Sequence, residues 1–471
     1  MATDFIIGNT DGRVQLLNRA PFRPGAKYVL YWAQVNRRVA WNHGLAYAVE
    51  LANQAGLPVL FYEGLTYDYP HASDRLHTFV MEGVPDTERH LRRLGIGYIF
   101  YLRRTRDDPN DVVYRLAKHA AALVTDDYPV FLAHRYNASV PAKLDIPYYA
   151  VDSSCIVPVS CFEKREYAAY TIRPKIRKQL PQYLKPLPSI RARHKFHGKI
   201  PNFHTRITAS NIGELVARCD IDHTVRPSPI FRGGSSAAQK RLRRFLKQSL
   251  HRYANSSNQP SENATSGLSP YLHFGHISSL QVALAVEDYA REHKLLPDEF
   301  LEELIIRREL AFNFACFTDH HESLEDLPDC DALPDWARRT LRKHSRDKRN
   351  PAYSPHQLER AETHDDLWNA AQKELLLTGK IHGYYRMYWG KKIIEWTPTP
   401  EDALATAIYL NDRYALDGRD PNSYTKILWC FGLHDRPWVE RPVFGQIRYM
   451  SYGGMRRKTD VDAYIRSIEC L

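Results

Sequence analysis

The sequence predicts a two-domain protein: an α/β domain built on a Rossmann-like, doubly wound parallel sheet, followed by an all-α domain. Three observations predict this division. The chain has 471 residues, more than one compact core usually holds. Short apolar runs alternate with helical patterns over residues 1–180, which is typical of a parallel sheet. Over residues 241–471 the pattern becomes mainly helical.

Apolar runs and glycine stops mark the elements of the first domain. Five runs predict buried strands, at residues 28–32, 59–62, 98–102, 123–125 and 148–151. Helical spacing predicts helices over residues 41–55, over a segment that ends near Gly95, and over residues 112–122. The chain has neither the glycine-rich dinucleotide fingerprint nor a P-loop, so neither mode of nucleotide binding is predicted for this sheet.

Residues 181–240 are expected to link the two domains, because they are rich in proline and lack periodicity. Beyond them, capping residues predict where helices begin and end. Asp365 opens a helix that Gly379 closes, and Thr399 precedes a helix that begins with Pro400.

One predicted helix, over residues 299–317, carries charged residues on two faces. Arg308 falls on the apolar stripe, so we expect it to bind a buried carboxylate or a cofactor anion. Glu303 and Arg307 lie one turn apart on the opposite face. An ordinary ion pair, worth about 0.2–0.5 kcal/mol, is sufficient to explain them by pattern alone.

Composition limits the function classes. The formal net charge is +11, and basic residues crowd residues 338–349, which indicates either a solvated surface or a track for nucleic-acid phosphates. The seven cysteines form no CxxC pair, so neither a metal site nor a disulfide framework is predicted. We see no secretion signal and no apolar run of membrane-spanning length, so a cytoplasmic protein is expected, nucleoid-associated if prokaryotic.

Two features place polar groups where a ligand could use them. Asn411 lies on the buried stripe of a helix, where an unbonded amide would cost roughly 1–3 kcal/mol. It is either a core asparagine bonded to its neighbours or an amide that faces a polar ring. The loop at residues 265–270 is rich in hydroxyls and leads into a helix, which favours phosphate binding, although a well-capped helix explains it equally simply.

The segment at residues 382–396 is the most informative one. Trp389 and Trp396 are seven residues apart and therefore share a helix face, while Met387 points away from that face. This pattern suits electron transfer on one side of a helix and substrate contact on the other. Taken singly, however, Trp368 and His382 are more often core residues than functional ones.

Residues 265–471 closely resemble the FAD-binding domain of the photolyase/cryptochrome family, in particular the class II cyclobutane pyrimidine dimer (CPD) photolyases. The N-terminal half is similar more loosely, through its sheet pattern and residues 36–42. The runs that carry the resemblance are at residues 268–275, 303–310, 367–372, 386–389, 417–422, 434–438 and 444–450.

The resemblance implies FAD, reduced and anionic in its active form, held in the helical domain. Arg386 and Asp417 would flank the isoalloxazine ring, and Asn411 would bond its N5 edge. The remaining expected cofactor residues are Tyr253, Thr265, Ser266, Gly267, Leu268, Ser269 and Arg308. The expected electron-transfer residues are Trp389, Trp368 and Trp396.

The resemblance also implies light-driven repair of CPDs by electron transfer from excited FAD to a flipped-out lesion. Glu303, Met387, Asn411 and Trp429 are the expected catalytic residues. UV-damaged DNA would be the partner of a monomeric protein, and a second, antenna chromophore of undetermined identity would belong to the N-terminal domain. The expected DNA-binding residues are Arg307, Lys391, Arg436, Arg441, Arg448, Arg456 and Arg457.

The chain departs from the family pattern at three places: Gly267 stands where many members have asparagine, residues 429–435 are one residue short, and Arg307 replaces an aromatic of some members. Three alternatives remain. Relatives that repair the (6-4) photoproduct have histidine at the position of Met387, and cryptochrome-like sensors often carry a longer C-terminal tail. A flavin-free DNA-binding protein would leave Asn411 and the tryptophans unexplained.

Overall fold

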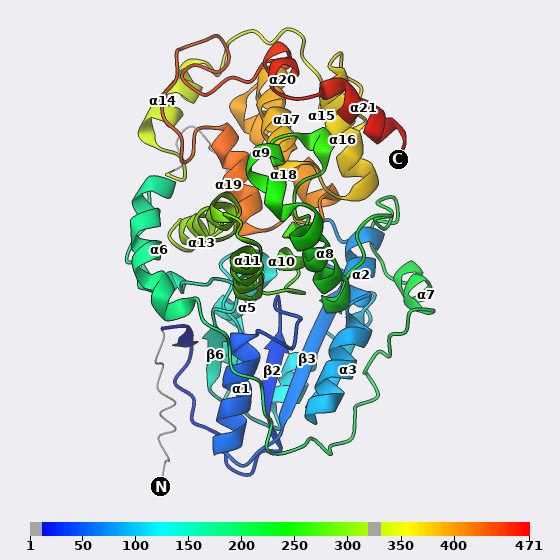
Figure 1. Cartoon of the computed structure of the whole chain (residues 1–471). Helices are drawn as coiled ribbons and strands as arrows, with labels where there is room; N and C mark the ends of the chain where they lie inside the picture. The colour runs from blue at the N-terminus through cyan, green and yellow to red at the C-terminus, as the bar shows by residue number, and fades with distance from the viewer. Residues whose placement is uncertain (1–11, 319–330) are drawn as a thin grey trace.

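The computed structural model describes residues 12–318 and 331–471 and has the two expected domains stacked end to end (Figure 1). The α/β domain comes first in the chain, and the helical domain follows it and contains the C-terminus. The prediction of a parallel-sheet domain followed by a helical domain is confirmed.

The sheet has six strands in the order β1-β6-β5-β2-β3-β4. All neighbouring pairs are parallel except β1 with β6, which is antiparallel. The chain runs outward from β2 in both directions, so the strand order reverses between β2 and β5, as in doubly wound sheets. The strands are β1 Val14–Leu16, β2 Tyr28–Ala33, β3 Val59–Thr66, β4 Gly97–Arg103, β5 Ala120–Asp126 and β6 Tyr148–Val151.

The five predicted strands are present, and two details were predicted wrongly. Strand β1 was missed, because it has only three residues and none of them is buried. The helix predicted over residues 112–122 ends at Ala117, since residues 120–122 begin β5. The three alanines there are fully buried between neighbouring strands, and this tertiary setting overrides their helix propensity. The helices of this domain are α1 His43–Gln54, α2 Asp74–Met81, α3 Val84–Leu94, α4 Val112–Ala117, α5 Phe131–Ser139 and α6 Ala169–Tyr183.

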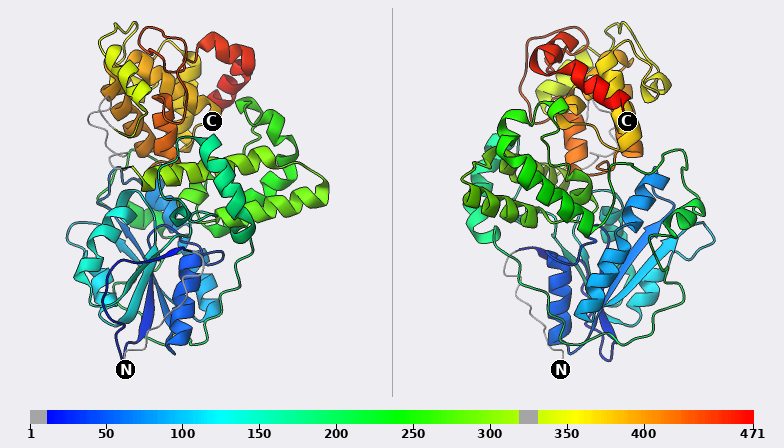
Figure 2. Two further views of the ribbon diagram at one scale, coloured as in Figure 1. Left: turned by 90° about the vertical axis from the view of Figure 1, so that its left-hand side faces the viewer. Right: turned by 45° about the vertical axis from the view of Figure 1, so that its right-hand side comes forward.

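The segment between α6 and α8 follows the outside of the α/β domain (Figure 2). It covers the edge of the sheet at β4: Phe196 N donates to the carbonyl of Gly95 at 2.8 Å, and Thr205 N donates to that of Phe100 at 2.7 Å. It contains one short helix, α7 Ile212–Ala217. Helix α8 begins at Ser235, a few residues before the predicted end of the linker.

The helical domain surrounds α17, whose residues are mostly buried. The predicted caps are confirmed: Asp365 accepts from Trp368 N, Gly379 ends its helix with φ +83°, and Thr399 accepts from Asp402 N. The helices are α8 Ser235–Gln248, α9 Tyr253–Ser256, α10 Ser269–His273, α11 Ser279–His293, α12 Asp298–Leu301, α13 Arg308–Cys316, α14 Asp335–Lys343, α15 Pro355–Glu359, α16 Asp366–Thr378, α17 Gly383–Trp396, α18 Pro400–Tyr414, α19 Pro421–Cys430, α20 Tyr452–Lys458 and α21 Val461–Glu469.

The helix predicted over residues 299–317 is not regular. A π-helical segment, Glu302–Arg307, separates α12 from α13. Such segments shift the register of the side chains that follow and are frequent at functional sites. This change of register could not be inferred from a period of 3.6 residues.

Buried polar contacts hold the two domains together. Arg75 on α2 donates to the carbonyls of Leu375 at 3.1 Å, Leu376 at 2.6 Å and Tyr414 at 2.7 Å. These carbonyls end α16 and α18, so one guanidinium of the α/β domain caps two helices of the other domain. Glu309 on α13 accepts from the backbone of Ile156 at 2.6 Å, which adds a second clamp.

Candidate functional site

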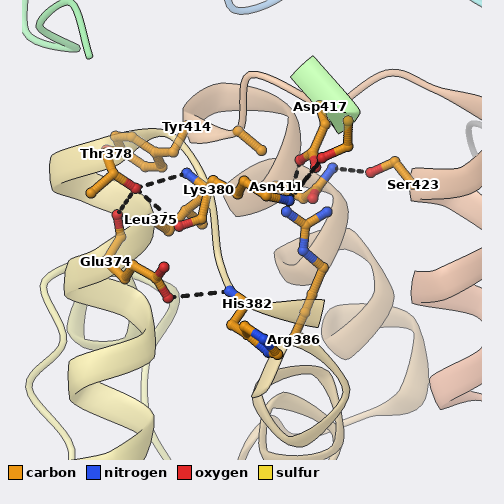
Figure 3. Close-up of polar contacts among 12 residues, drawn as sticks. Glu374, Leu375, Thr378, Lys380, His382, Arg386, Asn411, Tyr414, Asp417 and Ser423 are labelled. Carbon is orange, nitrogen blue, oxygen red and sulfur yellow. Dashed lines mark hydrogen bonds and ion pairs between the residues drawn. The ribbon is translucent and has the colours of Figure 1, made fainter. Parts of the chain in front are cut away.

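Asp417, in the turn between α18 and α19, is the centre of a buried ionic cluster (Figure 3). Arg386 Nη2 on α17 lies 2.7 Å from Asp417 Oδ1. The Ser269 hydroxyl donates to Oδ2 at 2.6 Å, and Lys380 Nζ lies 3.2 Å from the same oxygen. Burial alone would raise the pKa of Asp417, but Arg386 and Lys380 hold it well below its ordinary value. The predicted pair of Arg386 and Asp417 is therefore present, with two further partners.

Asn411 on α18 is buried, as its pattern predicted, with 2% of its surface exposed. Its amide nitrogen donates to Asp412 Oδ1 at 2.8 Å and to Ser423 Oγ at 2.7 Å. A carboxylate only accepts hydrogen bonds, so the Asp412 contact fixes the orientation of the amide. Both amide protons are used by these neighbours, and the carbonyl oxygen is the group through which Asn411 would meet a ligand.

A buried histidine provides a further polar atom beside this cluster. His382 Nδ1 accepts from Tyr384 N at 3.2 Å, which leaves the proton on Nε2. Within residues 12–318 and 331–471, Nε2 is buried and has no hydrogen-bond partner. A ligand with an acceptor atom would satisfy it. The ionic cluster, the oriented amide and this free donor together fit a polar ring system such as a flavin.

The predicted phosphate loop is less regular than expected. Helix α10, which follows it, has only five residues, so its dipole is small and the hydroxyls of Thr265, Ser266 and Ser269 would have to provide most of the polar contacts. Gly267 has φ +64°, and a Cβ there would lie 2.8 Å from Arg241 Nη1. Arg241 therefore occupies the space of the side chain that many family members have at position 267.

Tyr253 and Arg308 differ in how well they fit their expected roles. The ring of Tyr253 packs edge-on against Phe300 at a centroid distance of 5.3 Å. Its expected contact with the FAD phosphates stays a prediction. Arg308 is buried, but its guanidinium donates to the carbonyl of Ser154 at 2.6 Å and lies 4.5 Å from the Phe312 ring centre. Its main contact is thus with the α/β domain rather than with the Asp417 cluster.

The three predicted tryptophans are buried, and Trp368 contacts each of the other two. The rings of Trp389 and Trp368 are parallel, at a centroid distance of 6.5 Å and an angle of 2°. Trp368 meets Trp396 edge-on at 5.6 Å. Trp368 therefore lies between the other two, although it comes from a different helix, α16.

The outer end of this row reaches two residues that the sequence did not reveal. The ring of Tyr353 lies 5.4 Å from Trp396, and its hydroxyl lies 2.8 Å from Nδ1 of the exposed His364. The inner end, Trp389, lines a small cavity between α17, α18 and α19 together with Arg386 and Met387. The predicted electron path thus connects the ionic cluster with a half-buried tyrosine.

Aromatic and cationic side chains alternate beyond Met387. Lys391 Nζ lies 4.9 Å from the Trp429 ring centre, and Arg448 lies 5.6 Å from the same ring. Arg448 also lies 5.0 Å from the Trp438 ring, which Arg436 approaches at 5.2 Å. Trp438 belongs to the motif at residues 434–438, but the sequence predicted no function for it.

One predicted DNA contact has to be corrected. Lys391 is fully buried, and its ammonium donates to the carbonyl of Cys430 at 2.6 Å. It therefore cannot reach a DNA phosphate from this position, and it supports Trp429 from beneath. Burial lowers its pKa to about 8.

The other predicted DNA-binding residues are arginines with at least partly exposed side chains, and three of them lie on one loop. Helix α14 packs on the loop that contains Arg436, Arg441 and Arg448: Gln446 N donates to Thr340 Oγ1 at 2.9 Å. Arg448 is half-buried, and the other predicted arginines are exposed, namely Arg307, Arg436, Arg441, Arg456 and Arg457. Arg307 Nε lies 4.0 Å from Glu303, whose side chain is 55% exposed. This agrees with the ordinary ion pair that the pattern predicted.

A second, larger cavity of about 610 Å³ opens at the carboxyl ends of the parallel strands. Ligands of doubly wound sheets bind at this edge, where the strand order reverses. Trp32 and Tyr136 stack in its wall at 5.4 Å. Further lining residues are Tyr62, Tyr101, Arg103 and, from the helical domain, His273 and Arg419.

Residues 12–318 and 331–471 contain neither a cluster of metal-ligating side chains nor a membrane-spanning helix. No group of three or more His, Cys, Asp or Glu side chains there could hold a metal ion. No helix in the same residues is long and apolar enough to cross a membrane.

The fold is that of the photolyases and cryptochromes. A class III photolyase from Agrobacterium tumefaciens superposes with a TM-score of 0.68 at 15% identity, over 95% of this chain and 87% of that chain. An archaeal photolyase from Sulfolobus tokodaii, solved with two FAD molecules, gives a TM-score of 0.66 at 16% identity, over 93% of this chain and 89% of that chain.

The sequence comparisons then place the chain more closely. The family model for DNA photolyase matches residues 29–192. The deoxyribodipyrimidine photo-lyase of Methanothermobacter thermautotrophicus is 42% identical over 98% of each chain. The enzyme of the same name from Arabidopsis thaliana is 36% identical over 98% of this chain and 93% of its own. The chain therefore belongs to the DNA photolyase family, as the sequence motifs predicted.

Proposed function

We propose that this chain is a class II photolyase that repairs cyclobutane pyrimidine dimers in DNA by means of light and bound FAD. The observation that carries the proposal is the position of α17. Its residue Arg386 pairs with Asp417, and its residue Trp389 stacks on Trp368. Met387, on the same helix, lines one small cavity together with Arg386 and Trp389. One helix thus joins a cofactor cluster, an electron path and a lesion side.

Bound FAD would supply the chemistry, which is light-driven transfer of one electron to the dimer and its return after bond cleavage. The protein residues bind and orient. Arg386 and Asp417 would hold the polar edge of the isoalloxazine ring, and the carbonyl of Asn411 would accept from N5–H of the reduced, anionic form. His382 Nε2 would donate to a flavin acceptor.

The tryptophan row would deliver electrons from the protein surface when the flavin has become oxidised. Trp389 would be the inner member and Trp396 the outer one, with Trp368 between them. The hydrogen bond from Trp389 Nε1 to Gln372 Oε1, at 2.9 Å, fixes the orientation of the inner ring.

On the DNA side, Met387 and Trp429 would pack against the flipped pyrimidines, and Glu303 would bond their imide groups. Lys391 and Arg448 hold the Trp429 ring between them. The exposed Arg436 and Arg441, on the loop that packs against α14, would bind phosphates on either side of the lesion. A half-buried thioether at position 387 also disfavours (6-4) repair, for which the related enzymes have a histidine there.

The 610 Å³ cavity fits a second, light-harvesting chromophore. Aromatic walls and a few charged groups suit a planar, partly polar ring. The two FAD molecules of the Sulfolobus tokodaii photolyase support this role for a second pigment in the family. We further infer that the protein acts as a monomer in the cytoplasm, which size-exclusion chromatography and localisation of a tagged chain would test.

The proposal is tested with purified protein, reduced flavin and DNA that contains either CPDs or (6-4) photoproducts. Illumination is expected to restore thymines in the CPD substrate only, and the dark sample is expected to bind without repair. Full flavin occupancy without any repair would favour a light sensor instead. Repair of the (6-4) substrate alone would refute the assignment of the lesion.

A further inference from the structure

Lys380 is a partly buried cation that has no role in the proposed function. It lies in the turn between α16 and α17, and its side chain is 18% exposed. Its Nζ donates to Ser269 Oγ at 2.7 Å and lies 3.2 Å from Asp417 Oδ2 (Figure 3). It thus connects the end of the 265–269 loop with the carboxylate that also binds Arg386.

The charges around Asp417 do not balance. One carboxylate, whose pKa its neighbours hold low, faces the two cations Arg386 and Lys380. Burial lowers the pKa of Lys380, Asp417 opposes this effect, and Arg386 and Lys426 on α19 lower the pKa further. The carboxyl group of Glu374 on α16 is turned to other partners: it accepts from the Tyr464 hydroxyl at 2.7 Å and from His382 N at 3.2 Å. By its contacts, the single carboxylate of Asp417 is thus shared by two cations, which leaves the cluster with an excess of positive charge.

One cation, Arg386, is enough to neutralise Asp417, so Lys380 is a second cation in excess. Replacing Lys380 by a neutral residue would still leave the Arg386–Asp417 pair intact at 2.7 Å. Burial of a cation without its own counter-ion costs free energy, so its position suggests that another anion is bound there at some stage. Reduction of FAD at neutral pH takes up two electrons and one proton, so the product carries one additional negative charge.

We propose that Lys380 is a positioning residue that acts through Asp417 to stabilise the reduced, anionic flavin. This inference rests on the proposed function, because it requires FAD in the Asp417 cluster. Arg386 and Asp417 bind the ring in either redox state. Lys380 supplies the surplus charge that favours the reduced state.

The test compares the parent protein with K380M, K380R and a control, K373M, all loaded with FAD. Lys373 lies on the exposed face of α16 and has the same side chain outside the cluster. The two-electron reduction potential is measured by titration with dithionite against a reference dye. A unit charge about 10 Å away at an effective dielectric constant of about 20 changes the equilibrium roughly tenfold. Tenfold corresponds to about 30 mV for two electrons.

We expect K380M to lower the potential by about 30 mV, while K380R and K373M stay near the parent value, because arginine retains the charge. A K380M potential equal to that of the parent, with FAD fully bound, would overturn the inference and leave the proposed function intact. Loss of FAD from both K380M and K380R would also overturn it, since the charge is kept in K380R. Loss from K380M alone would support it. A parent protein that binds no FAD would refute both proposals.

Discussion

Removal of the Asp417 charge should destabilise the protein strongly. D417N keeps the shape of the side chain but leaves Arg386 and Lys380 buried beside each other without their counter-ion, at positions now 2.7 and 3.2 Å from Asp417 oxygens. Breaking a buried ion pair in this way costs about 3–5 kcal/mol. For a domain of the size of residues 235–471, each kcal/mol lowers the melting temperature by about 2–4 °C, so a decrease of roughly 6–20 °C is expected.

The assay is thermal unfolding at pH 7, with D288N as the matched control. Asp288 forms an Arg pair at 3.1 Å on α11, but the two side chains are 72% and 75% exposed, so the control should lose at most about 1 kcal/mol. Against the opposing effect of burial, the cations hold the pKa of Asp417 below its ordinary value, so its contribution is complete at pH 7. It is lost as pH falls below about 4, and the gap between parent and D417N should then shrink. Equal melting shifts for D417N and D288N at pH 7 would refute the reasoning.

Four further substitutions test other parts of the structure. W389F should block photoreduction but leave repair by chemically reduced protein intact; loss of both activities in a folded variant would exclude the relay role. R75M removes three helix-end hydrogen bonds and should lower the free energy of unfolding by roughly 3–4 kcal/mol in urea titrations, where an unchanged midpoint would show that the clamp is dispensable. R436Q, at an exposed position, should reduce the slope of log K for DNA against log salt by about one, and an unchanged slope would argue against a phosphate contact. Because burial lowers the pKa of Lys391 to about 8, its charge opposes folding at pH 7, and the parent should gain roughly 3 kcal/mol relative to K391M between about pH 8 and 10.5; a constant difference over that range would contradict this.

The fold could be predicted from sequence where burial produces a one-dimensional pattern. Strands β2 to β6 are buried on both faces and appear as short apolar runs, and helix caps such as Thr399 lie next to the helices they begin. Strand β1 left no such pattern, because it pairs along an edge and its residues are partly exposed. The π-helical segment before Arg308 was missed for a different reason, since its residues keep ordinary helical composition.

The site could be predicted where the residue type conflicts with its position or where a motif carries it. Asn411 and Arg386 were found in this way: the structure buries Asn411 and pairs Arg386 with Asp417. Lys391 was misplaced because lysine is usually exposed, whereas α17 is buried on nearly all sides. Lys380 gave no signal, because its partners Ser269 and Asp417 are 111 and 37 positions away in the chain.

The absorbance spectrum of the purified full-length protein tests the central claim most directly. A flavin held by the Asp417 cluster should give oxidised-flavin bands that correspond to at least one FAD per chain and that bleach on reduction with dithionite. A colourless protein that also fails to take up added FAD would contradict the account.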